Sequence, residues 1–293
     1  MISDFNSHRR DILVSKSPPV NLSVIDISPP RPKQTLIFLH GLGANAAQWQ
    51  AQIDYFSLRY RVIAIELRGH GQSDPSLSAF ERQKSAADIQ EAIRHHKSRQ
   101  PSVGLGYTRW PISRISHNWN KEATRELMGS PRPQLSMEVL LADLEVVLKK
   151  LNVKIPFVLV GHSLGGALAA EYAKERPYRL QHLILLATPP KFRLTPFTAF
   201  MLNSPSWLLP LAHLWLKAPP ALLQEFHNRV LKYWIGANTL NNLYVPTLLV
   251  RVPGNSYYEP GRLIIHDPRM HNIKPVMVSD PANGLNQAIA NFI

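Results

Sequence analysis

The segment that most constrains the fold is an apolar run, followed by a Gly-x-Ser-x-Gly motif and an alanine-rich run. Val158-Leu159-Val160 leads into Gly161-His162-Ser163-Leu164-Gly165, and residues 167–173 follow. The first run predicts a buried strand, and the second predicts a helix because Ala and Leu favour helices. A strand that turns this sharply into a helix strains its central residue, and the flanking glycines relieve the collision. The sequence therefore predicts Ser163 as a nucleophile exposed at a tight turn.

The motif alone is a weak signal, because small residues cluster in many loops. The strand before it and the helix after it make the signal specific. A phosphate-binding loop is disfavoured, since no lysine follows the glycines and their spacing matches neither a dinucleotide-binding motif nor a Walker loop.

Composition narrows the class of protein. The 293 residues are 45% hydrophobic and 18% charged, which is enough for one large α/β domain with an insertion. The absence of cysteine excludes disulfides, thiol nucleophiles and cysteine-bound metals. The first residues include Asp4 and no long apolar core, and no run of about 18 apolar residues occurs. We therefore expect no signal peptide, no transmembrane segment and a cytoplasmic protein, with an organelle as the alternative.

The net charge of +13 favours anionic partners. Nearly half of this positive charge lies in one segment of the chain. Residues 82–133 hold ten Lys or Arg and four Asp or Glu. We expect residues 80–133 to be a solvated, mobile insertion, because 98–133 has no hydrophobic period. Nucleic-acid binding through Arg109-Trp110 and His117-Asn118-Trp119 is disfavoured, and a non-native translated segment is an equal alternative.

Apolar runs alternate with helical patterns along the chain, which predicts an α/β fold with a mostly parallel, doubly wound sheet. Ligands bind such sheets at the carboxyl ends of the strands. The predicted strands are 9–16, 20–27, 35–39, 61–66, 158–160, 183–186, 246–250 and, as the last one, 262–265. The predicted helices are 45–57, a helix capped by Ser136, the helix after the motif, and 284–292.

Four motifs occur in an order that resembles the α/β-hydrolase superfamily, in its serine esterase and lipase-like branch. They are His40-Gly41-Leu42-Gly43, Arg68-Gly69-His70-Gly71-Gln72-Ser73, Gly161-His162-Ser163-Leu164-Gly165 and Pro246-Thr247-Leu248-Leu249-Val250. The resemblance implies the α/β-hydrolase fold, with a core over 1–188 and 246–293 and a helical cap over 189–245, after the sixth strand. It implies no cofactor and no metal.

An attacking Ser163 needs two donors for the developing oxyanion. The N–H of Leu164 at the helix start is one, and the resemblance assigns the second to the N–H of Leu42. The same resemblance places the base, a histidine, in a loop after the last strand, in the chain order Ser, acid, His. His271 is preferred over His266, although Met270 replaces the usual glycine.

The acid is less evident, because relatives carry Asp where this chain has Asn255 or Ser256. Glu259 is the nearest carboxylate and the candidate. Asp267 is an alternative, and a third possibility is that no acid orients His271, at a cost of about 10⁴ in turnover.

Aromatic and aliphatic residues are frequent in 189–245, which predicts an apolar pocket over Ser163. The same residues also serve as the buried faces of lid helices, and with Lys191, Arg193 and Lys217 they suit peripheral contact with a membrane.

The sequence predicts a serine hydrolase that cleaves a small to medium hydrophobic carboxylic ester through an acyl-enzyme. Cleavage of a C–C, amide or thioester bond is the alternative among enzymes. A small-ligand receptor or pseudoenzyme is the alternative from another class. The sequence sets no oligomeric state.

Overall fold

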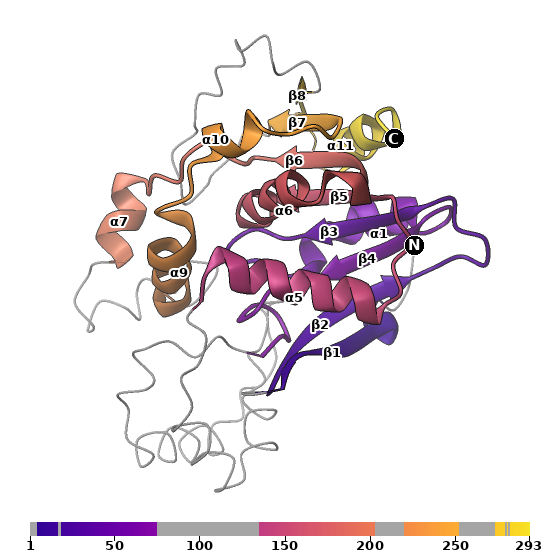
Figure 1. The fold of residues 1–293 in the computed structure, drawn as a ribbon, viewed down its shortest axis with the longest axis horizontal. Coiled ribbons are helices and arrows are strands. Elements are labelled where there is room, and N and C mark those ends of the chain that lie inside the picture. The colour runs from indigo at the N-terminus through magenta and orange to yellow at the C-terminus, as the bar shows by residue number, and fades with distance from the viewer. Residues whose placement is uncertain are drawn as a thin grey trace, which may run out of the picture.

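The computed structural model describes residues 5–16, 19–74, 135–202, 220–251, 273–278, 280 and 282–293. Within these ranges eight strands form one sheet in the order β1-β2-β4-β3-β5-β6-β7-β8 (Figure 1). The strands are β1 (Arg9–Lys16), β2 (Pro19–Ile27), β3 (Thr35–Leu39), β4 (Arg61–Ile65), β5 (Phe157–His162), β6 (Leu180–Leu186), β7 (Thr247–Arg251) and β8 (Ile273–Met277). β2 pairs antiparallel with β1 and β4, and the other pairs are parallel, which confirms the mostly parallel sheet predicted from the sequence.

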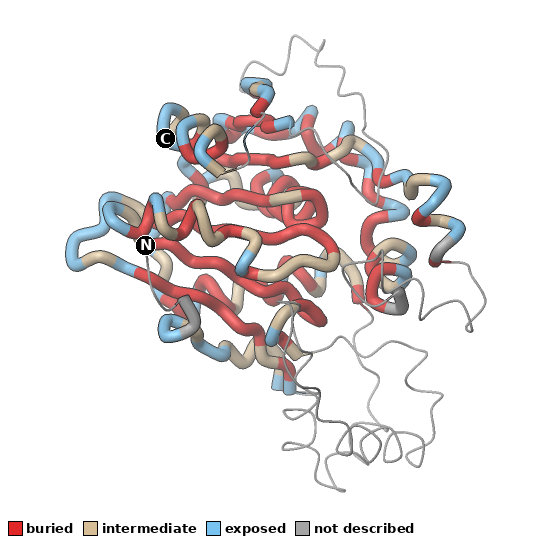
Figure 2. The backbone as a smooth tube through the Cα atoms, turned by 180° about the vertical axis from the view of Figure 1, so that it is seen from behind, coloured by how far each residue is buried: buried red, intermediate tan, exposed pale blue. Residues whose placement is uncertain are grey.

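Helices cover both faces of the sheet, which explains why its central strands are continuous apolar runs. The helices are α1 (Gln50–Phe56), α5 (Met137–Lys150), α6 (Leu164–Glu175), α7 (Pro196–Leu202), α9 (Pro220–Phe226), α10 (Gly236–Leu240) and α11 (Asn283–Ala290). Shorter helical turns span Phe5–His8, Ala46–Trp49, Pro177–Arg179 and His227–Leu231. Figure 2 shows the buried backbone concentrated along the central strands, with exposed residues at the loops and outer helices.

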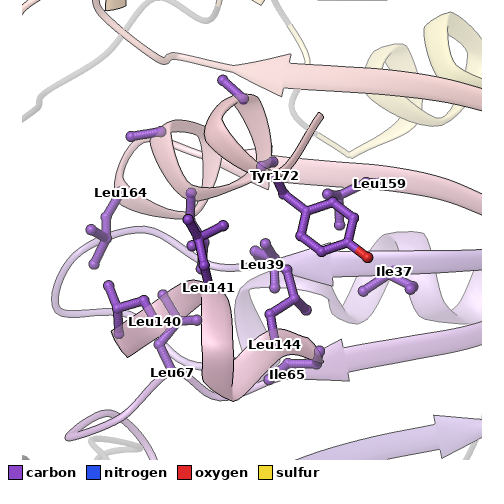
Figure 3. Close-up of a cluster of buried hydrophobic side chains, with 14 of the residues drawn as sticks. Ile37, Leu39, Ile65, Leu67, Leu140, Leu141, Leu144, Leu159, Leu164 and Tyr172 are labelled. Carbon is purple, nitrogen blue, oxygen red and sulfur yellow. The ribbon is translucent and has the colours of Figure 1, made fainter. Parts of the chain in front are cut away.

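Two hydrophobic clusters lie on opposite faces of the sheet. One cluster joins the strands to α5 and α6, and Figure 3 draws Leu140 and Leu144 of α5, Leu39 of β3 and Tyr172 of α6 among its members. The other cluster joins the strands to Trp49, α1 and α11. Alternate residues of each central strand enter the two clusters, so these strands are anchored from both sides.

Helix α5 begins where the sequence predicts. The Ser136 side chain accepts a hydrogen bond from the Val139 N–H at 3.4 Å, as an N-cap residue does. The leucines of α5 and Val147 are buried in the core. One charged residue, Asp143, is buried with them and makes a two-pronged contact with Arg68, at 2.8 and 2.6 Å. Burial raises the pKa of Asp143, and the Arg68 guanidinium opposes that rise.

The last strand differs from the sequence prediction. The structure places β8 at Ile273–Met277, so naming 262–265 as the last strand is wrong. Residues 262–265 themselves lie outside the described ranges. The physical reason is that β8 pairs only with β7 in the described sheet and has three exposed residues among its five. An edge strand tolerates Pro275 and lacks the apolar run by which buried strands are recognised.

The segment between β6 and β7, called the cap here, contains α7, α9 and α10 in its described part. Figure 1 shows these helices together at the left, beyond the ends toward which the arrows of the central strands point. Of the described helices, none has the length and apolar character needed to cross a lipid bilayer. The predicted insertion over 80–133 and cap residues 203–219 lie outside the described ranges.

The buried pair of Arg68 and Asp143 supplies a stability test. Arg68→Met leaves an uncompensated carboxylate in the core, so we expect a loss of about 3–5 kcal/mol in the free energy of unfolding. Urea denaturation measures this loss. The double variant Arg68→Met with Asp143→Leu should regain most of the stability, because both buried charges are then absent.

An ion pair whose arginine is exposed serves as the control. Arg10 contacts Asp26 at 3.5 Å with its own side chain 60% exposed, so Arg10→Met costs less than about 1 kcal/mol. A double variant as unstable as Arg68→Met alone would contradict this account of the buried pair.

Candidate active site

Ser163 stands at the turn between β5 and α6, with a backbone φ of 50° and ψ of −109°. This region is unfavourable for a residue with a side chain, and it persists only where neighbours hold it. The Ser163 N–H donates to the carbonyl oxygen of Leu186 at 2.9 Å, and the Ser163 carbonyl accepts from the Ala167 N–H at 2.9 Å. Both bonds anchor the strained residue to the sheet and to the first turn of α6.

The glycines of the motif allow the chain to pass through this turn. A Cβ atom on Gly161 would lie 2.3 Å from the carbonyl oxygen of Gly165. A Cβ atom on Gly165 would lie 2.4 Å from the carbonyl oxygen of Leu39. Both contacts are with backbone atoms, which cannot swing away, so neither position accepts a side chain without moving the sheet or the helix.

Loop 40–43 after β3 is joined directly to this turn. The Gly165 N–H donates to the carbonyl oxygen of His40 at 3.2 Å. The Leu67 N–H donates to Nε2 of His40 at 2.9 Å, so that nitrogen carries no proton. The proton is therefore on Nδ1, which donates to the carbonyl oxygen of Gly41 at 2.8 Å. One neutral imidazole thus fixes the loops after β3 and β4 beside the start of α6.

The two predicted oxyanion donors lie in these joined segments. The side chains of Leu42 and Leu164 are buried. Within the described ranges, neither the Leu42 N–H nor the Leu164 N–H donates to a protein acceptor. Backbone amides held in place without an acceptor are the kind of donor that stabilises an oxyanion.

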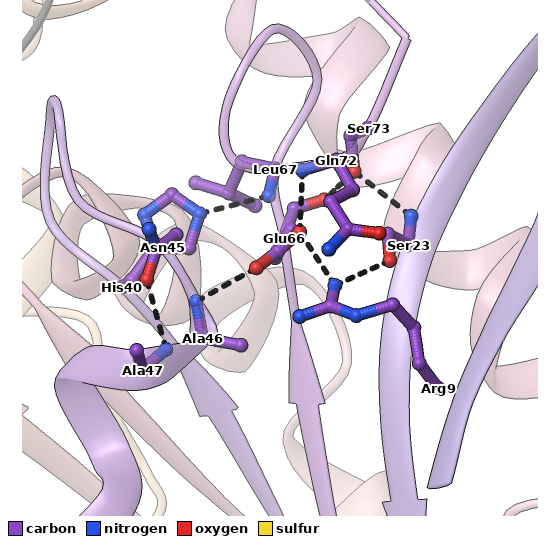
Figure 4. A network of polar contacts seen from close by, with 10 residues as sticks. All are labelled: Arg9, Ser23, His40, Asn45, Ala46, Ala47, Glu66, Leu67, Gln72 and Ser73. Atoms are coloured by element: carbon purple, nitrogen blue, oxygen red, sulfur yellow. Dashed lines mark hydrogen bonds and ion pairs between the residues drawn. The ribbon is translucent and has the colours of Figure 1, made fainter. Parts of the chain in front are cut away.

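Glu66, directly after β4, holds the segments that follow β3 and β4. The sequence analysis did not identify this residue. Its carboxylate accepts from the Ala46 N–H at 3.2 Å, the Gln72 N–H at 2.6 Å and the Arg9 guanidinium at 2.8 Å (Figure 4). Gly71, with a φ of 57°, packs so closely that a Cβ atom there would lie 2.3 Å from the Glu66 carboxyl carbon. An acid that ends a buried strand before a glycine-rich turn is the signal that would have found it.

Three histidines near the turn are uncharged, and two of them, His40 and His70, are fully buried. Burial lowers the pKa of His40 to about 4, of His162 to about 4 and of His70 to about 3. His70 donates from Nδ1 to the carbonyl oxygen of Arg68 at 3.0 Å, because a carbonyl only accepts. The His70 ring lies 5.0 Å from the His40 ring and 4.9 Å from the Phe226 ring of α9, between ring centres. The cap therefore packs directly on the loop after β4.

The predicted base and acid, His271 and Glu259, lie outside the described residues, as do His266, Asp267, Asn255 and Ser256. Because the last strand is β8, His271 precedes it in sequence, and no histidine follows it. Across the sheet, Ile273 of β8 is level with Thr247, Leu183 and Leu159. Leu159, in β5, precedes Ser163 by four residues. In the described part of the chain, no side chain bonds to the Ser163 hydroxyl.

Among the described residues, no group of three His, Asp or Glu side chains is arranged to hold a metal ion.

The buried imidazole of His70 generates a test of stability against pH. Its pKa is about 3 in the folded protein and ordinarily about 6.5, so the unfolded chain binds the extra proton between these values. Stability is full above about pH 6.5 and falls as the pH drops below it. We expect His70→Gln to reduce the loss between about pH 7 and about pH 5 by roughly 2 kcal/mol, measured by urea denaturation at each pH.

The exposed His8 provides the matched control, since His8→Gln should keep the wild-type dependence on pH. A His70→Gln protein that loses as much stability as the wild type on acidification would refute the assignment of His70 as a buried neutral group.

Comparisons with known proteins agree with this architecture. The sequence model described as "alpha/beta hydrolase fold" matches residues 34–236. Epoxide hydrolase 3 of Xenopus tropicalis is 38% identical over 86 residues, which cover 29% of this chain and 20% of that protein. The human (Lyso)-N-acylphosphatidylethanolamine lipase is 26% identical over 216 residues, which cover 69% of this chain and 48% of that protein. The matched parts thus span less than half the length of both curated relatives.

A solved structure extends the comparison to nearly the whole chain. The thermophilic esterase from Thermogutta terrifontis superposes with a TM-score of 0.58 at 17% identity, and covers 97% of each chain. At this identity the likeness concerns the fold alone. The family match over residues 34–236 spans more than half of the sequence and includes the turn that carries Ser163. The chain belongs to the α/β hydrolase fold family.

Proposed function

We propose that this protein is a serine hydrolase that cleaves a carboxylic ester through an acyl-enzyme, with Ser163 as the nucleophile. The observation that carries the proposal is the strained Ser163 at the strand-to-helix turn, 8% exposed and with its hydroxyl unbonded among the described residues. Such strain marks sites where geometry serves chemistry. The Leu42 and Leu164 amides, in segments joined by the bond from Gly165 to His40, support the proposal.

In the proposed reaction, Ser163 Oγ attacks the ester carbonyl carbon, and its proton passes to the imidazole base. The carbonyl oxygen becomes an oxyanion that the Leu42 and Leu164 N–H groups stabilise. The imidazolium then protonates the leaving alcohol, and water hydrolyses the acyl-enzyme by the same steps. His271 is the proposed base and Glu259 the proposed acid that orients it. Both assignments come from the motif resemblance of the sequence, and His271 stands before β8 rather than after it.

The proposed substrate is small to medium in size and hydrophobic. Phe226 of α9 packs on His70, in the loop that follows β4, so an apolar cap element lies close to the candidate site. Sites of this kind are lined mainly by apolar side chains with a few polar groups for orientation. The similarity to a human lipase is consistent with an ester substrate.

A second candidate function, a small-ligand receptor on the same fold, is favoured by one specific observation. The chain has Asn255 or Ser256 where the family pattern puts the aspartate that orients the base. In a receptor of this kind the same pocket holds the apolar ligand without turnover.

A fluorophosphonate probe and a series of p-nitrophenyl esters separate the two candidates. The hydrolase is labelled by the probe and turns over at least one ester. Ser163→Ala is expected to abolish labelling and to lower kcat by about 10⁴ or more, because the covalent route is lost. Absence of Ser163-dependent labelling and turnover in a folded wild-type protein would favour the receptor.

The base is tested by His271→Ala and His266→Ala, with the exposed His8→Ala as the control. We expect His271→Ala to lower kcat by about 10³–10⁴ and to slow labelling of Ser163, because the hydroxyl then lacks its proton acceptor. His266→Ala and His8→Ala should keep the wild-type kcat. A loss confined to His266→Ala would move the role of base to that residue.

A further inference from the structure

Two short segments of the cap, residues 190–194 and 232–236, are held against each other. The Gly236 N–H donates to the carbonyl oxygen of Pro190 at 2.8 Å. The rings of Phe192 and Trp234 pack with their centres 5.4 Å apart, and both side chains are buried. Each segment therefore turns its middle aromatic residue inward.

The residues that flank these two aromatics point the other way and are exposed. Five of them form what we call the cap patch: Lys191, Arg193, Lys232, Tyr233 and Ile235. Tyr233 is 72% exposed and Ile235 is 54% exposed, and the Lys232 ammonium lies 5.6 Å from the centre of the Tyr233 ring. Neither segment contains an aspartate or glutamate, so the patch combines three cations with an aromatic and an aliphatic side chain.

The cap patch is attached firmly to the helix that begins at the nucleophile. The Trp234 Nε1–H donates to Oε1 of Glu171 on α6 at 2.8 Å, and the Thr239 hydroxyl donates to the same oxygen. α6 begins at Leu164, directly after Ser163. A surface bound by the patch is thus held in a defined orientation relative to the candidate site.

We propose that the cap patch docks the protein on a lipid surface that carries anionic headgroups. Lysine and arginine are attracted to such a surface, and tyrosine is favoured at the level of the headgroups. Ile235 supplies apolar area that enters the outer edge of the acyl region, which a hydrated nucleic-acid backbone does not reward. The net charge of +13 adds a general attraction to anionic surfaces. This inference goes beyond the proposed hydrolase activity, because docking does not require Ser163.

Flotation of the full chain with vesicles tests the proposal. Phosphatidylcholine vesicles with about 30 mol% phosphatidylserine are compared with pure phosphatidylcholine vesicles. We expect binding to the anionic vesicles alone, weakened as NaCl rises from about 0.1 M to about 0.5 M. Lys191→Gln with Arg193→Gln should weaken binding about 25-fold, or about fivefold for each cation removed. Tyr233→Ser with Ile235→Ser should weaken the binding that remains at high salt.

Matched controls separate the cap patch from general charge and exposure. Lys149→Gln with Lys150→Gln removes two exposed cations at the end of α5, and Tyr178→Ser removes a side chain that is 75% exposed. Both controls should bind vesicles as the wild type does, and thermal denaturation checks that every variant is folded. Equal losses in control and patch variants, equal binding to neutral vesicles, or no vesicle binding would overturn the proposal. Patch-dependent binding to single-stranded DNA without flotation would overturn it in favour of a nucleic-acid partner.

The outcome is independent of the hydrolase proposal. Ser163→Ala should float with anionic vesicles as the wild type does. The patch variants should keep the wild-type turnover of a water-soluble p-nitrophenyl ester, if the protein turns one over. Flotation without any turnover would leave the docking surface standing and remove the proposed activity alone.

Discussion

Helix α6 begins so close to the carboxyl end of β3 that the Gly165 amide donates to the carbonyl oxygen of His40. Glycine alone fits there, since a Cβ atom would lie 2.4 Å from the carbonyl oxygen of Leu39. This contact brings the turn that carries Ser163 beside the loop that carries the Leu42 amide. The imidazole of His40 then ties in the loop after β4, so the arrangement of the candidate site depends on this one close approach.

The polar interior around the turn explains how its strain is sustained. Ser163 carries a backbone conformation that costs on the order of 1–3 kcal/mol, and two backbone hydrogen bonds hold it. Directly after β4, the buried Glu66 carboxylate is satisfied by two amides and the Arg9 guanidinium. Buried charges are tolerated when they are bonded in this way, and such bonds make the loops rigid.

The cap is joined to the core by polar contacts as well as apolar ones. Glu171 on α6 accepts from Trp234 and Thr239, and Phe226 packs on His70. The helix and the loop that border the nucleophile therefore also carry the cap. The position of the cap patch and the geometry at Ser163 therefore both depend on α6 and on the loop after β4.

The sequence alone determined the elements whose signal is local. Buried parallel strands appear as apolar runs, the start of α5 as the N-cap residue Ser136, and the turn at Ser163 as glycines at fixed spacing. Only the tertiary structure decided which distant residues meet: Arg9 with Glu66, Arg68 with Asp143, and Glu171 with Trp234. It also decided that β8 is Ile273–Met277, because an edge strand with Pro275 lacks the apolar run of a buried one. The pattern of neighbouring residues predicts burial and backbone conformation. Which polar groups pair across long sequence separations depends instead on how the whole chain packs.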